Sequence, residues 1–236
     1  MTTQSVPQTV SGAKSDYIVA KFGGTSVANF EAMSRCSEII VADKSVRIVA
    51  VSASAGVTNH LVALCKPDLS KEQRQEHIDG VLAIQQAILD ELSLDADLAV
   101  GFNETLKAFQ TLALETLTTD QQHDELLSFG ERLSSYLFAQ VLRLKGLNAD
   151  RFDVRKVLKT DSQFGKATPD VAATAQAAKD LLIPLLDEQV IVTQGFIGSD
   201  EFGQTTTLGR GGSDYSAALV AEAINAKSVH IWTDVV

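Results

Sequence analysis

The chain has 236 residues, of which 45% are hydrophobic and 21% charged, values that fit a globular α/β protein and exclude a disordered or fibrous one. Its 20 basic and 30 acidic residues give a net charge of −10, which disfavours binding to nucleic acid or to an anionic membrane surface. With only two cysteines, a disulfide framework or a cysteine-rich zinc site is also excluded.

The first part of the chain, residues 1–16, is polar, and we expect it to be a disordered leader. It lacks the apolar run of a secretory signal. No later stretch reaches the length of about 18 apolar residues that a membrane span requires. We therefore expect a cytosolic protein without a membrane partner.

Strand and helix patterns alternate along most of the remaining chain. The strands are apolar runs without alternation, which indicates a mainly parallel sheet covered on both faces, that is, a three-layer αβα sandwich. Residues 70–145 are helical almost throughout, with breaks near 93–97 and 118–120, and predict three helices forming an insertion or lid at one edge of the sheet. The other expected elements are strands at 17–22, 47–52, 149–153, 189–193 and 228–233, helices at 27–42 (N-cap Thr25 or Ser26), 59–66, 169–186 (ended or kinked by Pro184) and 213–225, and a loop at 198–212.

Four of the predicted loops are rich in Gly, Ser and Thr, and each follows a strand or precedes a helix. In open α/β sheets, ligands bind at the carboxyl ends of the strands. Small residues let backbone N–H groups approach an anion closely, and helix N-termini add a favourable dipole. We therefore expect one anion-binding rim, made of residues 23–26, 52–58, 195–198 and 205–214.

The common nucleotide motifs do not fit these loops. The Walker pattern Gly-x-x-x-x-Gly-Lys-Ser/Thr is absent. In Gly209-Arg-Gly-Gly-Ser-Asp214, Asp214 stands where a dinucleotide fingerprint would have its third glycine. A phosphate site in this chain must use another arrangement.

Three charged residues are candidates for chemistry at the rim. Lys21 ends a predicted strand, where it would stabilise charge on a transferring phosphoryl group, unless it is an edge-strand lysine that extends into water. Arg210 suits bidentate binding of a substrate carboxylate, with a solvated loop arginine as the alternative. Glu131 follows a glycine in a helical pattern and would hold a substrate ammonium, unless it is an ordinary exposed helix residue.

These residues stand in motifs that resemble the signatures of aspartate kinases, which have the amino-acid kinase fold. The resemblance covers about residues 18–235 in the family's order, and its Gly-Arg-Gly-Gly-Ser-Asp form is closest to the monofunctional, lysine-sensitive enzymes. The matching motifs are Lys21-Phe-Gly-Gly-Thr-Ser-Val, Ser52-Ala-Ser-Ala-Gly-Val-Thr-Asn59, Phe129-Gly-Glu-Arg132, Phe152-Asp-Val-Arg155, Gln194-Gly-Phe-Ile197, Thr206-Thr-Leu-Gly-Arg-Gly-Gly-Ser-Asp214 and Trp232-Thr-Asp234.

The resemblance implies transfer of the γ-phosphoryl group of ATP to L-aspartate, giving 4-phospho-L-aspartate at the start of lysine, threonine and methionine biosynthesis. It also implies Mg²⁺ on the phosphates, no protein residue as a metal ligand, and a homodimer in the full-length family. The accepting carboxylate is already ionised at neutral pH, so no general base is needed. The roles implied by position are catalysis for Lys21 and Asp214, aspartate binding for Ser52, Thr58, Glu131 and Arg210, and binding of ATP and its phosphates for Lys21, Gly23, Gly24, Gly211, Gly212, Ser213, Thr233 and Asp234.

The family continues well past the Trp-Thr-Asp motif. The resemblance therefore implies that residues 17–236 are a catalytic domain truncated at its C-terminal end, without regulatory domains and with poor affinity for ATP. Two alternatives remain open. One is a non-catalytic fragment. The other is an enzyme of the same fold that acts on glutamate, acetylglutamate, carbamate or UMP instead of aspartate. Glu131 disfavours acetylglutamate, which has no free ammonium group.

Overall fold

In the computed structural model, residues 15–233 are described, and none of their helices is both long and apolar enough to cross a membrane. The centre of the molecule is a five-stranded sheet with the order β3-β4-β2-β1-β7, in which every pairing is parallel. The mainly parallel sheet expected from the apolar strand runs is confirmed. Its strands are β1 (Ile18–Phe22), β2 (Val46–Val51), β3 (Ala149–Arg151), β4 (Val190–Gln194) and β7 (Ser228–Trp232).

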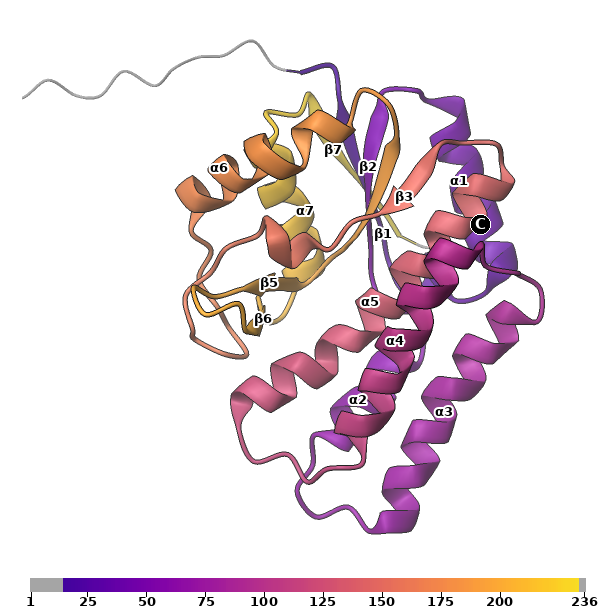
Figure 1. Ribbon diagram of the computed structural model, residues 1–236, viewed down its shortest axis with the longest axis vertical. Helices are drawn as coiled ribbons and strands as arrows, with labels where there is room; N and C mark the ends of the chain where they lie inside the picture. The colour runs from indigo at the N-terminus through magenta and orange to yellow at the C-terminus, as the bar shows by residue number, and fades with distance from the viewer. Residues whose placement is uncertain (1–14, 234–236) are drawn as a thin grey trace, which may run out of the picture.

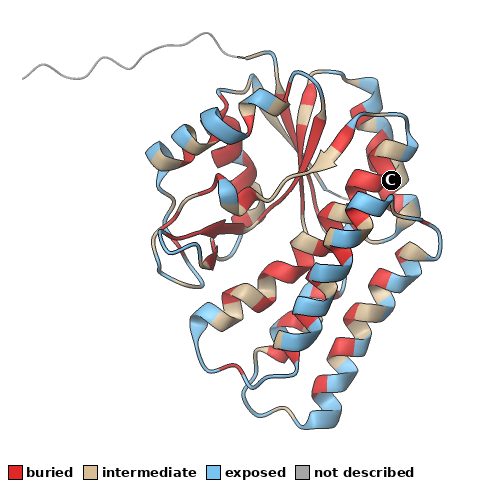
Figure 2. Cartoon of the chain, viewed as in Figure 1, coloured by how far each residue is buried: buried red, intermediate tan, exposed pale blue. Residues whose placement is uncertain are grey.

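Helices cover both faces of this sheet, which confirms the three-layer αβα sandwich (Figure 1). Helix α1 (Phe30–Ala42) and the second half of α5 (Asp120–Leu144) pack on one face. Helices α6 (Val171–Leu181) and α7 (Gly212–Ala223) pack on the other. Successive side chains of a strand point to opposite faces, so the central strands are buried on both sides, as Figure 2 shows.

The helical region extends below the sheet in Figure 1 and has a hydrophobic core of its own. It contains α2 (Val57–Leu64), α3 (Lys71–Leu89), α4 (Ala96–Ala113) and the first half of α5. The three helices expected over 70–145 are confirmed, and capping boxes begin α3 and α5. The interpretation as a lid at one edge of the sheet is wrong for α5. Its second half carries a buried apolar stripe that belongs to the core under the sheet, including Leu133, Leu137 and Val141.

The structure corrects the predictions for several local elements. The predicted N-cap, Thr25 or Ser26, is wrong, because these residues form a 3₁₀ turn (Thr25–Val27) and Asn29 caps α1 by accepting a hydrogen bond from the Ala32 N–H at 2.8 Å. Helix α6 ends at Leu181, and Pro184 lies in a separate 3₁₀ turn, Ile183–Leu185. A proline there cannot donate the backbone hydrogen bond that a longer helix would need.

The expected loop at 198–212 instead contains two short strands, β5 (Ile197–Ser199) and β6 (Thr205–Thr207), which pair antiparallel. Three-residue strands are too short to show a periodicity in the sequence. Their pairing is supported by side chains from distant parts of the chain. The Arg155 guanidinium donates a hydrogen bond to the Thr205 hydroxyl at 2.8 Å, and the Thr207 hydroxyl donates one to Asp124 at 2.7 Å.

Candidate functional site

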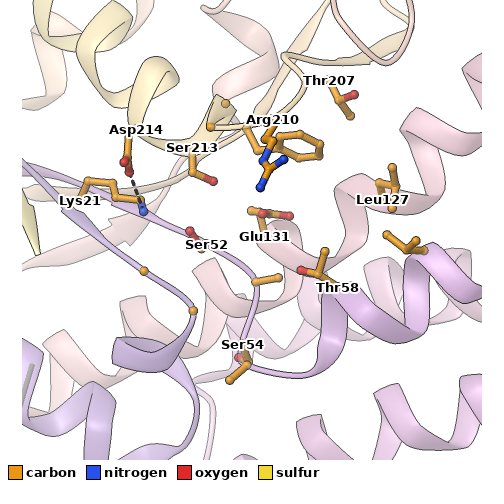
Figure 3. A pocket seen from close by; sticks show the side chains of 18 of the residues that line it. Lys21, Ser52, Ser54, Thr58, Leu127, Glu131, Thr207, Arg210, Ser213 and Asp214 are labelled. Atoms are coloured by element: carbon orange, nitrogen blue, oxygen red, sulfur yellow. Dashed lines mark ion pairs between the residues drawn. The ribbon is translucent and has the colours of Figure 1, made fainter. Parts of the chain in front are cut away.

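A cavity of about 870 Å³ lies at the carboxyl ends of the central strands, between the sheet and helices α2 and α5 (Figure 3). All four predicted Gly/Ser/Thr loops contribute to its wall, so the expectation that they form one rim is confirmed. The predicted site residues that line it are Lys21, Gly23, Gly24, Ser52, Thr58, Glu131, Arg210, Gly211, Gly212, Ser213, Asp214 and Thr233. Asp234 lies outside the described residues.

Lys21 lies at one end of the cavity. Strand β1 is paired with β2 on one side and β7 on the other, so the alternative of an edge-strand lysine is wrong. The Lys21 ammonium lies 2.7 Å from Oδ1 of Asp214, and only 7% of the Lys21 side chain is exposed, against 49% for Asp214. A buried charge needs a partner of this kind. The pair holds the ammonium at the cavity wall, beside the first turn of α7.

Glu131 lies on α5 and is buried, so the alternative of an exposed helix residue is wrong. Burial raises the pKa of its carboxyl group to about 7, although a hydrogen bond with the Ala53 backbone and the charge of Lys21 oppose the shift. A buried anion with this pKa gains stability from a cationic ligand group placed beside it. The carboxyl group is therefore suited to bind an ammonium.

Arg210 is exposed and lines the cavity away from the Lys21 end. Figure 3 shows its guanidinium group directed into the cavity on the side where Glu131 lies, while Lys21 and Asp214 lie together at the other end. The cavity therefore presents one cation and one anion close together, and a second cation farther along. A ligand with an ammonium and more than one anionic group fits this order of charges.

The backbone at the cavity wall requires glycine at two positions. A Cβ atom on Gly24 would lie 2.8 Å from the Ala53 carbonyl oxygen, so the β1 turn packs directly against the loop after β2. Gly211 has a φ of 77° and immediately precedes α7, a conformation that glycine adopts without strain. The Gly212 N–H donates to the Gly209 carbonyl oxygen at 2.9 Å, and the next two N–H groups of the first turn, those of Ser213 and Asp214, have no partner within the helix. They lie at the cavity, together with the Ser213 side chain.

Three further polar residues, none with a role predicted from the sequence, connect the segments around the cavity. The Ser134 hydroxyl donates a hydrogen bond to the Ser52 carbonyl oxygen at 2.7 Å. The Gln194 side chain accepts from the Val154 N–H at 2.9 Å and donates to the Ser135 hydroxyl at 2.8 Å. The third is Asp124, a buried carboxylate that accepts three hydrogen bonds from the loops opposite α5.

A sequence signal for Asp124 did exist. Asp124, Leu127 and Glu131 are spaced three and four residues apart, so they share one face of α5. Leu127 and Glu131 both line the cavity. Once Glu131 was a candidate, this spacing would have placed Asp124 on the same face.

The model of the family described as "Amino acid kinase family" matches residues 16–236. The chain belongs to the amino acid kinase family.

Among curated proteins, this family member is 48% identical to the lysine-sensitive aspartokinase 3 of Escherichia coli strain K12, over 94% of this chain and 49% of that protein. It is 38% identical to the aspartokinase of Chlamydia trachomatis serovar D, over 92% of this chain and 48% of that protein. The chain thus spans about half the length of the curated relatives it matches.

A crystal structure of Escherichia coli aspartokinase III in complex with aspartate and ADP has the same fold. It matches with a TM-score of 0.88 at 48% sequence identity, over 92% of this chain and 49% of that chain. The likeness extends across the sheet and the helices on both of its faces, which agrees with the αβα architecture of the amino acid kinase family.

Proposed function

We propose that this chain carries the aspartate site and part of the ATP site of an aspartate kinase, which converts ATP and L-aspartate into ADP and 4-phospho-L-aspartate. One observation carries the proposal: a single cavity places the buried acid Glu131 beside the guanidinium of Arg210, with the ammonium of Lys21 farther along. These groups are the complement of an amino acid with two carboxylates, lying next to a polyphosphate. The aspartokinase names of the relatives support the same reaction.

The aspartate end of the proposed site uses the side chains on α2, α5 and the loop before α7. Glu131 accepts hydrogen bonds from the substrate ammonium, and the planar guanidinium of Arg210 binds the α-carboxylate through two parallel hydrogen bonds. In Figure 3, Ser52 lies on the wall between these charges and the Lys21 end, and Thr58 lies on the other side of Glu131. In this pose the side-chain carboxylate points toward Lys21, where the phosphoryl group is transferred.

The phosphate end consists of Lys21, the Gly-Gly turn after β1 and the first turn of α7. Backbone N–H groups at Gly24 and in the first turn of α7 hold phosphate oxygens, and the Lys21 ammonium stabilises charge on the transferring group. Gly23 lies beside them, and its own N–H donates to the Trp232 carbonyl oxygen at 3.2 Å. A side-chain carboxylate oxygen of aspartate forms the new bond to the γ-phosphorus. The bond from that phosphorus to the β–γ bridging oxygen breaks, and its electron pair leaves on ADP. Asp214 orients Lys21, and no proton is transferred.

The proposal includes Mg²⁺ as the counter-ion of ATP. The cavity offers two carboxylates, those of Glu131 and Asp214, and no group of three candidate metal ligands occurs within residues 15–233. This donor set fits an ion that keeps most of its water and binds chiefly to phosphate oxygens. When bound, Mg²⁺ would neutralise phosphate charge, with Asp214 as the nearest available side chain at the phosphate end. Thr233 and Asp234 begin the nucleotide side of the proposed site, and a cytosolic homodimer is part of the same proposal.

Calorimetric titration of the chain with three acids tests the substrate assignment. L-aspartate should bind saturably. L-glutamate is one methylene longer, and N-acetyl-L-aspartate has no ammonium group for Glu131, so both should bind at least about tenfold more weakly. Turnover is followed by ADP release with the same three acids. Preference for L-glutamate, or equal binding of N-acetyl-L-aspartate, would overturn the assignment, and absence of aspartate binding would reject the function for this chain.

A further inference from the structure

We propose that Asp124 is a positioning residue of the aspartate site, because its carboxylate fastens the loop at Gly165 and strand β6 to α5 and thereby fixes the span between Glu131 and Arg210. The inference rests on the proposed function, since that span matters only if both residues bind the same substrate molecule. Asp124 itself would not touch the substrate. It acts through the backbone that carries Arg210.

The contacts of Asp124 join three separate segments of the chain. Oδ2 of its carboxylate accepts a hydrogen bond from the Gly165 N–H at 2.9 Å and another from the Thr207 N–H at 2.8 Å. Oδ1 accepts from the Thr207 hydroxyl at 2.7 Å. Only 1% of Asp124 is exposed. A single buried carboxylate thus connects α5, the loop at Gly165 and strand β6.

The Gly165 loop and strand β6, both bound by Asp124, also contact each other. The Ala167 N–H donates a hydrogen bond to the Thr207 carbonyl oxygen at 2.9 Å. The Gly165 carbonyl oxygen lies 3.1 Å from the position that a Cβ on Gly209 would occupy. Gly209 immediately precedes Arg210, so the backbone before the guanidinium rests directly on the loop that Asp124 anchors. Little freedom remains for this segment to move away from α5.

The other end of the span lies on the same helix as Asp124. Leu127 and Glu131 line the main cavity, and Asp124 lines a smaller adjoining cavity of about 400 Å³ that shares Leu127 and Gly165 with it. Glu131 follows Asp124 by seven helical positions, a rigid rise of about 10 Å. The helix therefore sets the position of Glu131, and the Asp124 carboxylate sets the position of the Arg210 loop relative to that helix.

The burial of Asp124 indicates that its hydrogen bonds with Gly165 and Thr207 have a specific role. Burial raises the pKa of its carboxyl group, and the bonds from Gly165 and Thr207 oppose the shift. A buried carboxyl group is costly for folding and is kept only where donors surround it. Strand β6 has a second tie at its other end, where Arg155 holds the Thr205 hydroxyl. The Asp124 tie is the one nearest Arg210.

The test compares Asp124→Ala with Asp124→Asn. Alanine removes all three hydrogen bonds. Asparagine restores them, since its carbonyl oxygen can accept from both N–H groups while its NH₂ group donates to the Thr207 hydroxyl. We expect alanine to weaken L-aspartate binding by at least about tenfold, because small displacements of substrate-holding groups cost about this much or more, and asparagine to stay within about threefold of the parent chain.

A stability-matched control separates positioning from general loss of structure. Ile40→Ala removes a buried side chain near the far end of α1 and should lower the melting temperature without changing aspartate affinity. Hydrogen exchange of residues 163–168 and 205–210 is measured without ligand, and only Asp124→Ala should exchange faster there. Unchanged exchange in Asp124→Ala, or equal loss of affinity in Ile40→Ala, would overturn the inference.

The two proposals fail in different ways. If the parent chain binds no aspartate, the proposed function fails, while the exchange measurement still decides whether Asp124 fastens the loops. If the parent binds aspartate and Asp124→Ala binds it equally well, the positioning role fails and the proposed function stands.

Discussion

The ammonium of Lys21 and the carboxylate of Asp214 lie 2.7 Å apart and join the central strand β1 to the first turn of α7. The lysine side of this pair is buried, whereas the aspartate side is half-exposed at the cavity. The pair therefore fixes where a positive charge meets the cavity before any ligand arrives. Charge that is already in place needs no reorganisation when negative charge develops on a transferring group.

Replacing Lys21 by alanine removes this charge from the phosphate end and leaves the aspartate end intact. We expect turnover, measured as ADP release, to fall by about a hundredfold to a thousandfold. The dissociation constant for L-aspartate, measured by calorimetry, should change by less than about threefold, because Glu131 and Arg210 are untouched. Equal losses of turnover and aspartate affinity would show that Lys21 supports the whole cavity and has no specific role in transfer.

The pKa of Glu131 makes a prediction about folding. Its folded-state pKa is about 7, against 4.5 for an unperturbed Glu, so between these values the folded protein holds a proton that the unfolded chain has lost. The free energy of unfolding therefore decreases as pH rises through this window, and the deficit persists at higher pH. Glu131→Gln removes it and should be more stable than the parent at pH 8 by roughly 1–3 kcal/mol.

Urea unfolding at pH 5 and pH 8 measures this difference, which should shrink toward pH 5 as the parent carboxyl group becomes protonated. The same variant should lose most of its affinity for L-aspartate, because the neutral amide cannot balance the substrate ammonium. A variant that is less stable than the parent at pH 8 would contradict the predicted penalty for the buried charge.

The two neighbouring glycines after β1 give a matched pair for stability. A Cβ on Gly24 would lie 2.8 Å from the Ala53 carbonyl oxygen, whereas the nearest atom to a Cβ on Gly23 is 3.8 Å away. Gly24→Ala should therefore lower the free energy of unfolding by about 1–3 kcal/mol through steric overlap with the backbone. Gly23→Ala should stay within about 0.5 kcal/mol of the parent. If the two variants unfolded at the same urea concentration, the turn after β1 and the loop after β2 would be able to move apart without cost.

Arg74 provides a prediction for the helical region. Its buried guanidinium donates hydrogen bonds to the carbonyl oxygens of Leu64 at 3.4 Å and Ala113 at 3.0 Å, at the ends of α2 and α4. Arg74→Met keeps much of the volume but leaves these oxygens without a donor, and should cost about 1–3 kcal/mol of unfolding free energy. In the control Arg35→Met, the partly exposed Arg35 loses its ion pair with Glu31, which should cost less than about 1 kcal/mol.

The sequence was most informative where one local rule decides the structure. Gly24 and Gly211 mark turns that other residues adopt only with strain or overlap, and apolar runs without alternation define a sheet that is buried on both faces. The rim of the cavity followed from the four Gly/Ser/Thr-rich loops at the ends of those strands. Lys21, Glu131 and Arg210 were candidates by residue type, each with an alternative, and the resemblance implied the same roles. Their place in one cavity agrees with it.

The sequence was least informative where distant segments decide the structure. Asp124 looked like one of several acidic residues at the start of a helix, and only the approach of Gly165 and Thr207 turns it into a buried anchor. Strands β5 and β6 depend on side chains more than 40 residues away. Helix α5 packs on the sheet with one half and on α2–α4 with the other, a division that periodicity alone cannot assign.

The position of β7 beside β1 has a consequence for how the molecule is made. The two strands pair in parallel although they are about 200 residues apart in the chain. Contacts between such distant segments form late, because the intervening loop must close first. During synthesis, Lys21 leaves the ribosome with the first strand, about 190 residues before Asp214 and about 210 before β7. The ion pair that holds this lysine at the cavity therefore cannot form until those later segments have also emerged.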